Sequence, residues 1–167
     1  YTFSAGTLGG AGDVEVAGGT TTFAGATSGV SFEVSGGTAA FSGSSGGNHF
    51  KVSGGTANIG GTHTGTGKLT LAAGTVGGTG SASFSALDFT GGTVSAKLTS
   101  NGTTTISGAS DKSLAGGELT LGGNTSWDGS AINASGGAKI TNQSGKTFTA
   151  AADGLIANAG TASFKND

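Results

Sequence analysis

One short unit recurs along this chain: an apolar-x-apolar triplet, two small residues and a Gly-Thr corner. Two clear copies are residues 14–20 (VEVAGGT) and 32–38 (FEVSGGT). Self-similarity at a near-constant spacing is typical of a stacked array of repeats. We therefore expect residues 1–167 to form a single domain built from one repeated unit. The triplets that we assign to successive repeats begin at Tyr1, Val14, Phe32, Phe50, Leu69, Leu87, Thr104, Leu119, Ile132 and Phe148.

The first and third residues of each triplet are apolar and the middle one is usually polar, which is the alternation of a strand with one buried face. Val14 and Val16 would point inward, with Glu15 outward. A second alternating stretch follows each corner, as at Ala39 and Phe41. Repeats this short have no room for a helical crossover, whereas a coiled chain stacks each strand in parallel on its equivalent in the next turn. The sequence predicts an all-β fold: a single-stranded parallel β-helix (β-solenoid) of about ten coils of roughly 13–19 residues, wound in the right-handed sense.

Glycine pairs stand at most corners. A sharp bend between strands often requires a positive φ, which glycine adopts without strain. We expect this backbone conformation at the glycines Gly18, Gly36, Gly54 and Gly91.

The corner threonines should stack into a column of hydroxyl groups on the outer surface. Ice-binding solenoids display two such columns, but the residues two positions further on are of mixed type, as at Ala40 and Gly77. Ice binding is therefore a minor alternative. The expected column contains Thr7, Thr20, Thr38, Thr56, Thr75 and Thr93, with Ser110 and Asn124 extending it.

The composition excludes several functions. The chain has no cysteine, so no disulfide framework, thiolate metal site or cysteine nucleophile exists. Its net charge of -2 and scattered lysines do not provide the dense cationic surface that nucleic acid requires. No segment approaches the roughly 18 apolar residues that a membrane-spanning helix needs. We expect neither nucleic acid nor a membrane span among its contacts.

Two carboxylates invite an enzymatic interpretation. Stacking would place Glu15 and Glu33 about one strand spacing apart, near the roughly 5 Å separation of a retaining glycosidase pair. A working pair also needs environments that separate the two pKa values, and an open face beside Lys51 does not provide them. The sequence also lacks a nucleophile elbow of the Gly-x-Ser-x-Gly type. We predict a solvated face, no enzymatic activity and no catalytic residues.

The two histidines, His49 and His63, fall in the variable segments of adjacent repeats. They could approach each other, but no carboxylate lies nearby in the sequence to complete a metal site. We interpret both as exposed loop residues, and we predict no metal and no cofactor.

The single tryptophan, Trp127, precedes Asp128. An exposed indole beside a carboxylate could stack on a sugar ring, and these two residues are the candidate surface contact. The alternative is that Trp127 fills a wider part of the core.

Residues 32–43 (FEVSGGTAAFSG) resemble the repeats of secreted bacterial β-helix proteins, namely autotransporter passengers and filamentous-haemagglutinin-like adhesins. The resemblance implies a secreted or cell-surface rod on the bacterial outer surface, with a role in adhesion, autoaggregation or biofilm formation. Its partners would be surface glycans or proteins. The Gly-Asp-Ser-Gly signature of protease relatives is missing, so their activity does not carry over.

The repeat pattern continues up to both ends of the sequence, at residues 1–3 and 160–164. Unpaired strand edges invite pairing with another chain. We therefore expect either a piece of a longer protein or a self-assembling fibre subunit that stacks end to end. The fibre is the main alternative to an adhesin stalk, and a polysaccharide-active β-helix enzyme ranks third beside ice binding.

Overall fold

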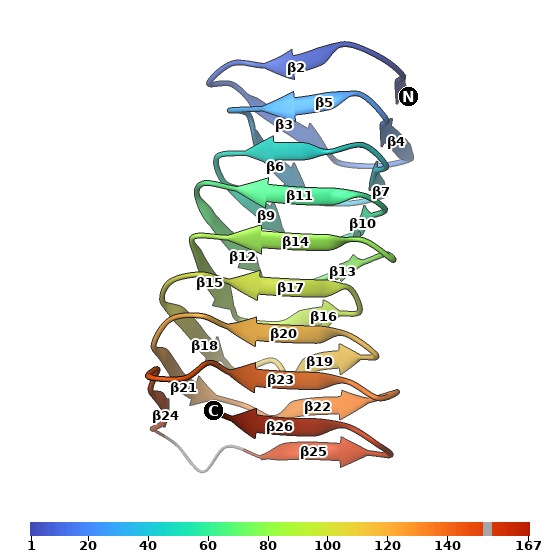
Figure 1. The fold of residues 1–167 in the computed structure, drawn as a ribbon. Helices are drawn as coiled ribbons and strands as arrows, with labels where there is room; N and C mark the ends of the chain where they lie inside the picture. The colour runs from blue at the N-terminus through green and yellow to red at the C-terminus, as the bar shows by residue number, and fades with distance from the viewer. Residues whose placement is uncertain (152–154) are drawn as a thin grey trace.

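The computed structural model describes residues 1–151 and 155–167, and this part of the chain contains β-strands and no helix. The strands form three parallel sheets that are the three sides of a β-solenoid, as predicted (Figure 1). In Figure 1 the chain descends from the N-terminus, running to the left along the front side and returning to the right behind it. This winding is right-handed.

The first side, sheet A, has nine strands. Its strands pair in register from coil to coil, so that Thr38 lies beside Thr56 and Phe41 beside Ile59. In order, the strands are β1 (Thr2–Phe3), β4 (Thr20–Phe23), β7 (Thr38–Phe41), β10 (Thr56–Ile59), β13 (Thr75–Gly77), β16 (Gly92–Val94), β19 (Lys112–Ala115), β22 (Ile132–Ser135) and β25 (Ile156–Ala159).

The second side, sheet B, also has nine strands and lies at the front of Figure 1. Its strands are β2 (Thr7–Gly9), β5 (Ala26–Ser28), β8 (Ser45–Gly47), β11 (Thr62–Gly65), β14 (Ser81–Phe84), β17 (Lys97–Ser100), β20 (Glu118–Leu121), β23 (Lys139–Asn142) and β26 (Ser163–Asn166).

The third side, sheet C, has eight strands and contains most of the triplets that the sequence revealed. Its strands are β3 (Asp13–Val16), β6 (Ser31–Val34), β9 (Phe50–Val52), β12 (Lys68–Leu71), β15 (Ala86–Phe89), β18 (Thr104–Gly108), β21 (Thr125–Gly129) and β24 (Phe148–Ala150).

The solenoid has about eight coils, and the predicted count of about ten is wrong. Three of the assigned triplets belong to other sides: the one at Tyr1 enters β1 of sheet A, the one at Leu119 lies in β20 of sheet B, and the one at Ile132 lies in β22 of sheet A. Strands on all three sides alternate in the same way, so a triplet does not reveal its side. Coils measured on sheet C range from 17 residues to 23, and the longest are near the C-terminal end.

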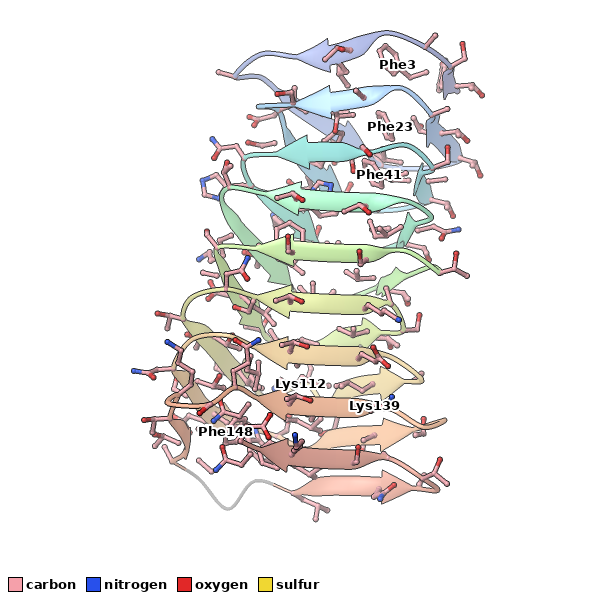
Figure 2. All side chains as sticks on the ribbon, viewed as in Figure 1. Phe3, Phe23, Phe41, Lys112, Lys139 and Phe148 are labelled. Atoms are coloured by element: carbon pink, nitrogen blue, oxygen red, sulfur yellow. The ribbon has the colours of Figure 1, made fainter. Side chains whose placement is uncertain are left out.

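The interior contains ladders of like side chains. Phe32 pairs with Phe50, and Val34 with Val52, as the alternation predicted. Figure 2 shows Phe3, Phe23 and Phe41 one below another at the inner side of sheet A. Burial of such side chains, worth about 1.5–3 kcal/mol each, offsets the ordering entropy of a chain with 37 glycines.

At the glycine-pair corners the positive φ falls on the second glycine and not on the first. Gly19 and Gly37 have φ of 65° and 64°, whereas the prediction named Gly18 and Gly36. At Gly36 the first glycine is needed for a different reason: a Cβ there would lie 2.3 Å from the carbonyl oxygen of Ala17 in the preceding coil, whereas a Cβ on Gly18 would meet nothing within 4 Å. Gly54 and Gly91 also lack the predicted positive φ, which falls on Gly55 and Gly92 instead. Carbonyl oxygens of the preceding coil would lie 2.3 Å and 2.4 Å from a Cβ on Gly54 and Gly91.

Candidate functional site

A shallow depression of about 420 Å³ lies on the outer surface of sheet C, over β3, β6 and β9. The in-register pairing of these strands places Glu15 beside Glu33 and Glu33 beside Lys51, which confirms the predicted outward column. The depression is lined by Asp13, Val14, Glu15, Ser31, Phe32, Glu33, His49 and Lys51.

Both glutamates of this depression already have partners within the protein. The hydroxyl of Ser35 donates to Oε1 of Glu15 at 2.5 Å, and that of Ser53 donates to Oε1 of Glu33 at 2.9 Å. The Nζ of Lys51 lies 2.8 Å from Oε1 of Glu33. Hydrogen bonds from Lys51 and then from Ser53 lower the pKa of Glu33 below 4.5. Glu33 is therefore an ionised carboxylate, and the ammonium group of Lys51 balances its charge.

The state of Glu33 differs from that of the general acid in a glycosidase pair. The general acid of such a pair needs a raised pKa, so that it retains its proton near neutral pH. Glu33 is shifted in the opposite direction. What the depression offers is a set of fixed hydrogen-bonding groups, with acceptors on the carboxylates and donors on Lys51 and Ser31.

The two histidines have different environments. His49 is exposed, as predicted, and lines the depression, where its Nδ1 accepts a weak hydrogen bond of 3.4 Å from the backbone N–H of Lys68. His63 is 1 % exposed and points into the core from β11, so its predicted place in an exposed loop is wrong. Burial lowers the pKa of His63 to about 4. Across residues 1–151 and 155–167, no group of three or more His, Asp or Glu side chains is arranged to hold a metal ion.

Trp127, proposed from the sequence as a surface contact, points into the core. It is 4 % exposed, lies beside Ile106 of the preceding coil, and donates from Nε1 to the carbonyl oxygen of Ser130 at 3.3 Å. The second interpretation, that it fills a wider part of the core, is the one that the structure supports. Asp128 is exposed on the outer side of β21, without an indole face beside it.

The outer surface of sheet A displays the predicted hydroxyl column, but the residues predicted at its two ends do not belong to it. Thr7 belongs to β2 of sheet B, and Ser110 and Asn124 lie outside the strands. The neighbouring column on sheet A is mixed, as expected, because Thr22 is followed by Ala40, Asn58 and Gly77. The column itself consists of Thr20, Thr38, Thr56, Thr75, Thr93 and Ser113.

A second hydroxyl column, on the outer surface of sheet B, was missed in the sequence. Its signal is a polar-apolar-Thr triplet that returns every 21 residues, at residues 97–99, 118–120 and 139–141. The column consists of Thr64, Ser83, Thr99, Thr120 and Thr141.

Charge is distributed unevenly over the three sides. The strands of sheet A contain one charged residue, Lys112, and its side chain is buried (Figure 2). Its Nζ donates to the carbonyl oxygen of Gly108 at 3.0 Å, and burial lowers its pKa, although Asp111 opposes the shift. The described strands of sheet A therefore present no charge to the solvent.

Sheet B carries a short ladder of alternating charges. Glu118 lies between Lys97 and Lys139 on successive coils, with N–O distances of 3.8 Å and 3.1 Å. The hydrogen bond and charge of Lys139, followed by the charge of Lys97, lower the pKa of Glu118. Such exposed pairs contribute little stability.

Comparison with family models, with curated proteins and with solved structures found no match to this chain. Within the residues that the structure describes, no helix is long and apolar enough to cross a membrane. The fold defines the class: a three-sided, parallel β-solenoid repeat protein.

Proposed function

We propose that this chain is a non-enzymatic rod module of a secreted or cell-surface adhesin, which binds surface glycans or proteins through its outer columns. The observation that supports this best is the uninterrupted solenoid. Between consecutive strands that the structure describes, no connection exceeds five residues, so these strands follow one another without an inserted domain. Its outward side chains are held at a fixed spacing of about 4.8 Å along the axis.

A repetitive surface of this kind suits weak, repeated contacts. Each coil presents similar outward groups, such as the hydroxyls of Thr38 and Thr56 on sheet A. A ligand that is itself repetitive, such as a polysaccharide, could contact several coils at once, and linked weak contacts add up to strong overall binding. The depression on sheet C adds carboxylate and ammonium groups, which hydrogen-bond well to sugar hydroxyls.

The enzymatic alternative has less support. Catalysis by the carboxylates of the depression would require one of them to act as a proton donor, and the partners of Glu33 favour its ionised form instead. Lys51 and Ser53 keep that carboxylate neutralised and hydrogen-bonded.

The proposal is tested by coating beads with the chain and measuring their binding to an array of surface polysaccharides and to whole bacterial cells. The matched control is the triple variant Glu15→Gln, Glu33→Gln, Lys51→Met, which removes three charged side chains of the depression and leaves Asp13 in place. Saturable binding without chemical change of the glycan is expected, and the triple variant shows whether the depression contributes.

Two outcomes would contradict the proposal. Cleavage of a polysaccharide by the wild-type chain, lost in Glu33→Gln, would establish an enzyme. Ordered, concentration-dependent filaments in negative-stain images, with no bead binding, would favour the fibre subunit.

A further inference from the structure

His63 lies in the middle of the rod, at a position that apolar side chains occupy in other coils. On the inner side of sheet B it is flanked by Ser45 of β8 and Ala82 of β14, and further along the same column stand Leu98 and Leu119. The imidazole is therefore part of the stacked interior.

The buried imidazole has a single hydrogen-bond partner. Its Nδ1 lies 2.7 Å from the hydroxyl oxygen of Ser45, whose residue is 6 % exposed. The other ring nitrogen, Nε2, is buried and has no partner. A neutral imidazole can leave one nitrogen unpaired at moderate cost, whereas the charged form has two N–H donors and must be desolvated as an ion.

Aromatic rings enclose the rest of the imidazole. The ring centroids of Phe50 and Phe84 both lie 5.1 Å from that of His63, and the centroid of Phe41 lies 6.0 Å away. Phe84 is in the following coil, so the cage joins neighbouring coils.

No charged group faces the imidazole to stabilise a proton on it. The strands packed against it, β7, β8, β9 and β14, carry one charged residue between them, Lys51, which points outward. The other polar side chain nearby on the inner column is Thr27, whose hydroxyl donates to the carbonyl oxygen of Gly46 at 3.1 Å. Protonated His63 would therefore be an isolated buried cation.

We propose that His63 makes the middle of the rod an acid-sensitive opening point: protonation of the imidazole opens the coils from β7 to β14, while the coils toward the C-terminal end stay folded. Each coil of a solenoid contacts only its neighbours, so a local defect need not unfold the whole array. This inference does not depend on the proposed adhesin function.

The direction of the pH dependence follows from linkage. Burial holds the pKa of His63 at about 4, against the ordinary value of 6.5 for a histidine side chain. Between these values the open state binds more protons than the closed state, so the stability of this region falls as the pH falls from 6.5 to about 4, and His63 contributes no further loss below that. The opening equilibrium should shift on the order of a hundredfold between pH 7 and pH 4.

The experiment is hydrogen exchange followed by mass spectrometry at pH 7 and pH 4, corrected for intrinsic exchange rates. In the wild-type chain we expect protection within residues 38–84 to fall on the order of a hundredfold more than protection within residues 97–142. The double variant Ser45→Ala, His63→Leu should lose this difference. The variant His49→Gln removes the exposed histidine and should retain it.

The proposal is overturned if the double variant keeps the differential loss, or if the wild-type chain loses protection equally along its length. A second measurement covers the case in which the double variant does not fold. In the wild-type chain, the ring signals of His63 should titrate together with the loss of amide protection in β8 and β14. Titration with protection intact would overturn the proposal.

Discussion

The rings of Phe23 and Phe41 stack with centroids 4.9 Å apart and planes 12° from parallel, although 18 positions separate them in the sequence. Phe32 meets both rings edge-on, with centroids 5.2 Å and 5.1 Å away. Consecutive coils thus contribute to one aromatic cluster. Such pairs add about 0.5–1.5 kcal/mol beyond the burial of their area.

Phe41→Ala should therefore be strongly destabilising. Phe41 is 1 % exposed, and loss of its ring would leave a cavity between coils, at a cost of about 3–5 kcal/mol in the free energy of unfolding. Chemical denaturation measures this change. Phe164→Ala, at a phenylalanine that is 40 % exposed, is the matched control and should cost much less.

Three glycine substitutions distinguish the two reasons for glycine at the corners, namely a positive φ and close approach between neighbouring coils. Gly18→Ala should have little effect, because φ is not positive there and an added Cβ meets nothing within 4 Å. Gly19→Ala should cost about 1 kcal/mol for its positive φ alone. Gly37→Ala should cost more than either, because its Cβ would also lie 2.3 Å from the carbonyl oxygen of Gly19.

Thermal and chemical unfolding of the three variants would give this order. Equal destabilisation by Gly19→Ala and Gly37→Ala would show that close approach of the coils contributes nothing.

Lys51→Met should raise the pKa of Glu33, because the hydrogen bond from Lys51 is the largest cause of its lowering. The carboxyl carbon signal of Glu33, followed by NMR over a pH titration, reports the shift. Since the folded-state pKa is lowered, the associated stability is present above pH 4.5 and is lost as the pH falls below it. The Lys51→Met variant should therefore lose less folding stability than the wild-type chain as the pH falls below 4.5.

Lys146→Met, at an exposed lysine of the β23–β24 connection, is the control for general loss of positive charge. An equal rise in the pKa of Glu33 in this control would contradict a local ion pair.

Asn142→Ala should destabilise the coil near the C-terminal end. The buried Asn142 amide donates to the carbonyl oxygen of Lys146 at 2.8 Å and to Oδ1 of Asn166 at 2.7 Å. Loss of both donors would leave unpaired acceptors, at a cost of about 1–3 kcal/mol. Asn101→Ala changes an exposed asparagine and should be nearly neutral in the same denaturation experiment.

The alternation within each strand could be predicted from the sequence, because a period of two depends on one strand alone. For this reason the inward ladder through Phe32, Phe50 and Leu69 is correct. The side to which a strand belongs depends on the path through the corners. Leu119 and Ile132 were misassigned because their triplets satisfy the same alternation on sheets B and A.

The environment of His63 could not be predicted for a different reason. Its strand reads Thr-His-Thr, and three polar residues in succession do not show which face is buried. The facing is decided by residues far away in the sequence, Ser45 and Ala82, which adjoin it in the stacked coils. The second hydroxyl column required the same information about neighbouring coils.

The in-register stacking of sheet C also bears on how the molecule can change in length. Phe32, Phe50 and Leu69 occupy one inner position in three successive coils. Excision of residues 50–68 would bring Leu69 onto Phe32 and Gly74 onto Gly37, with every later side chain keeping its orientation. Duplication of the same segment would extend the rod by one step, so gain and loss of whole turns conserve the architecture where shorter insertions or deletions would break it.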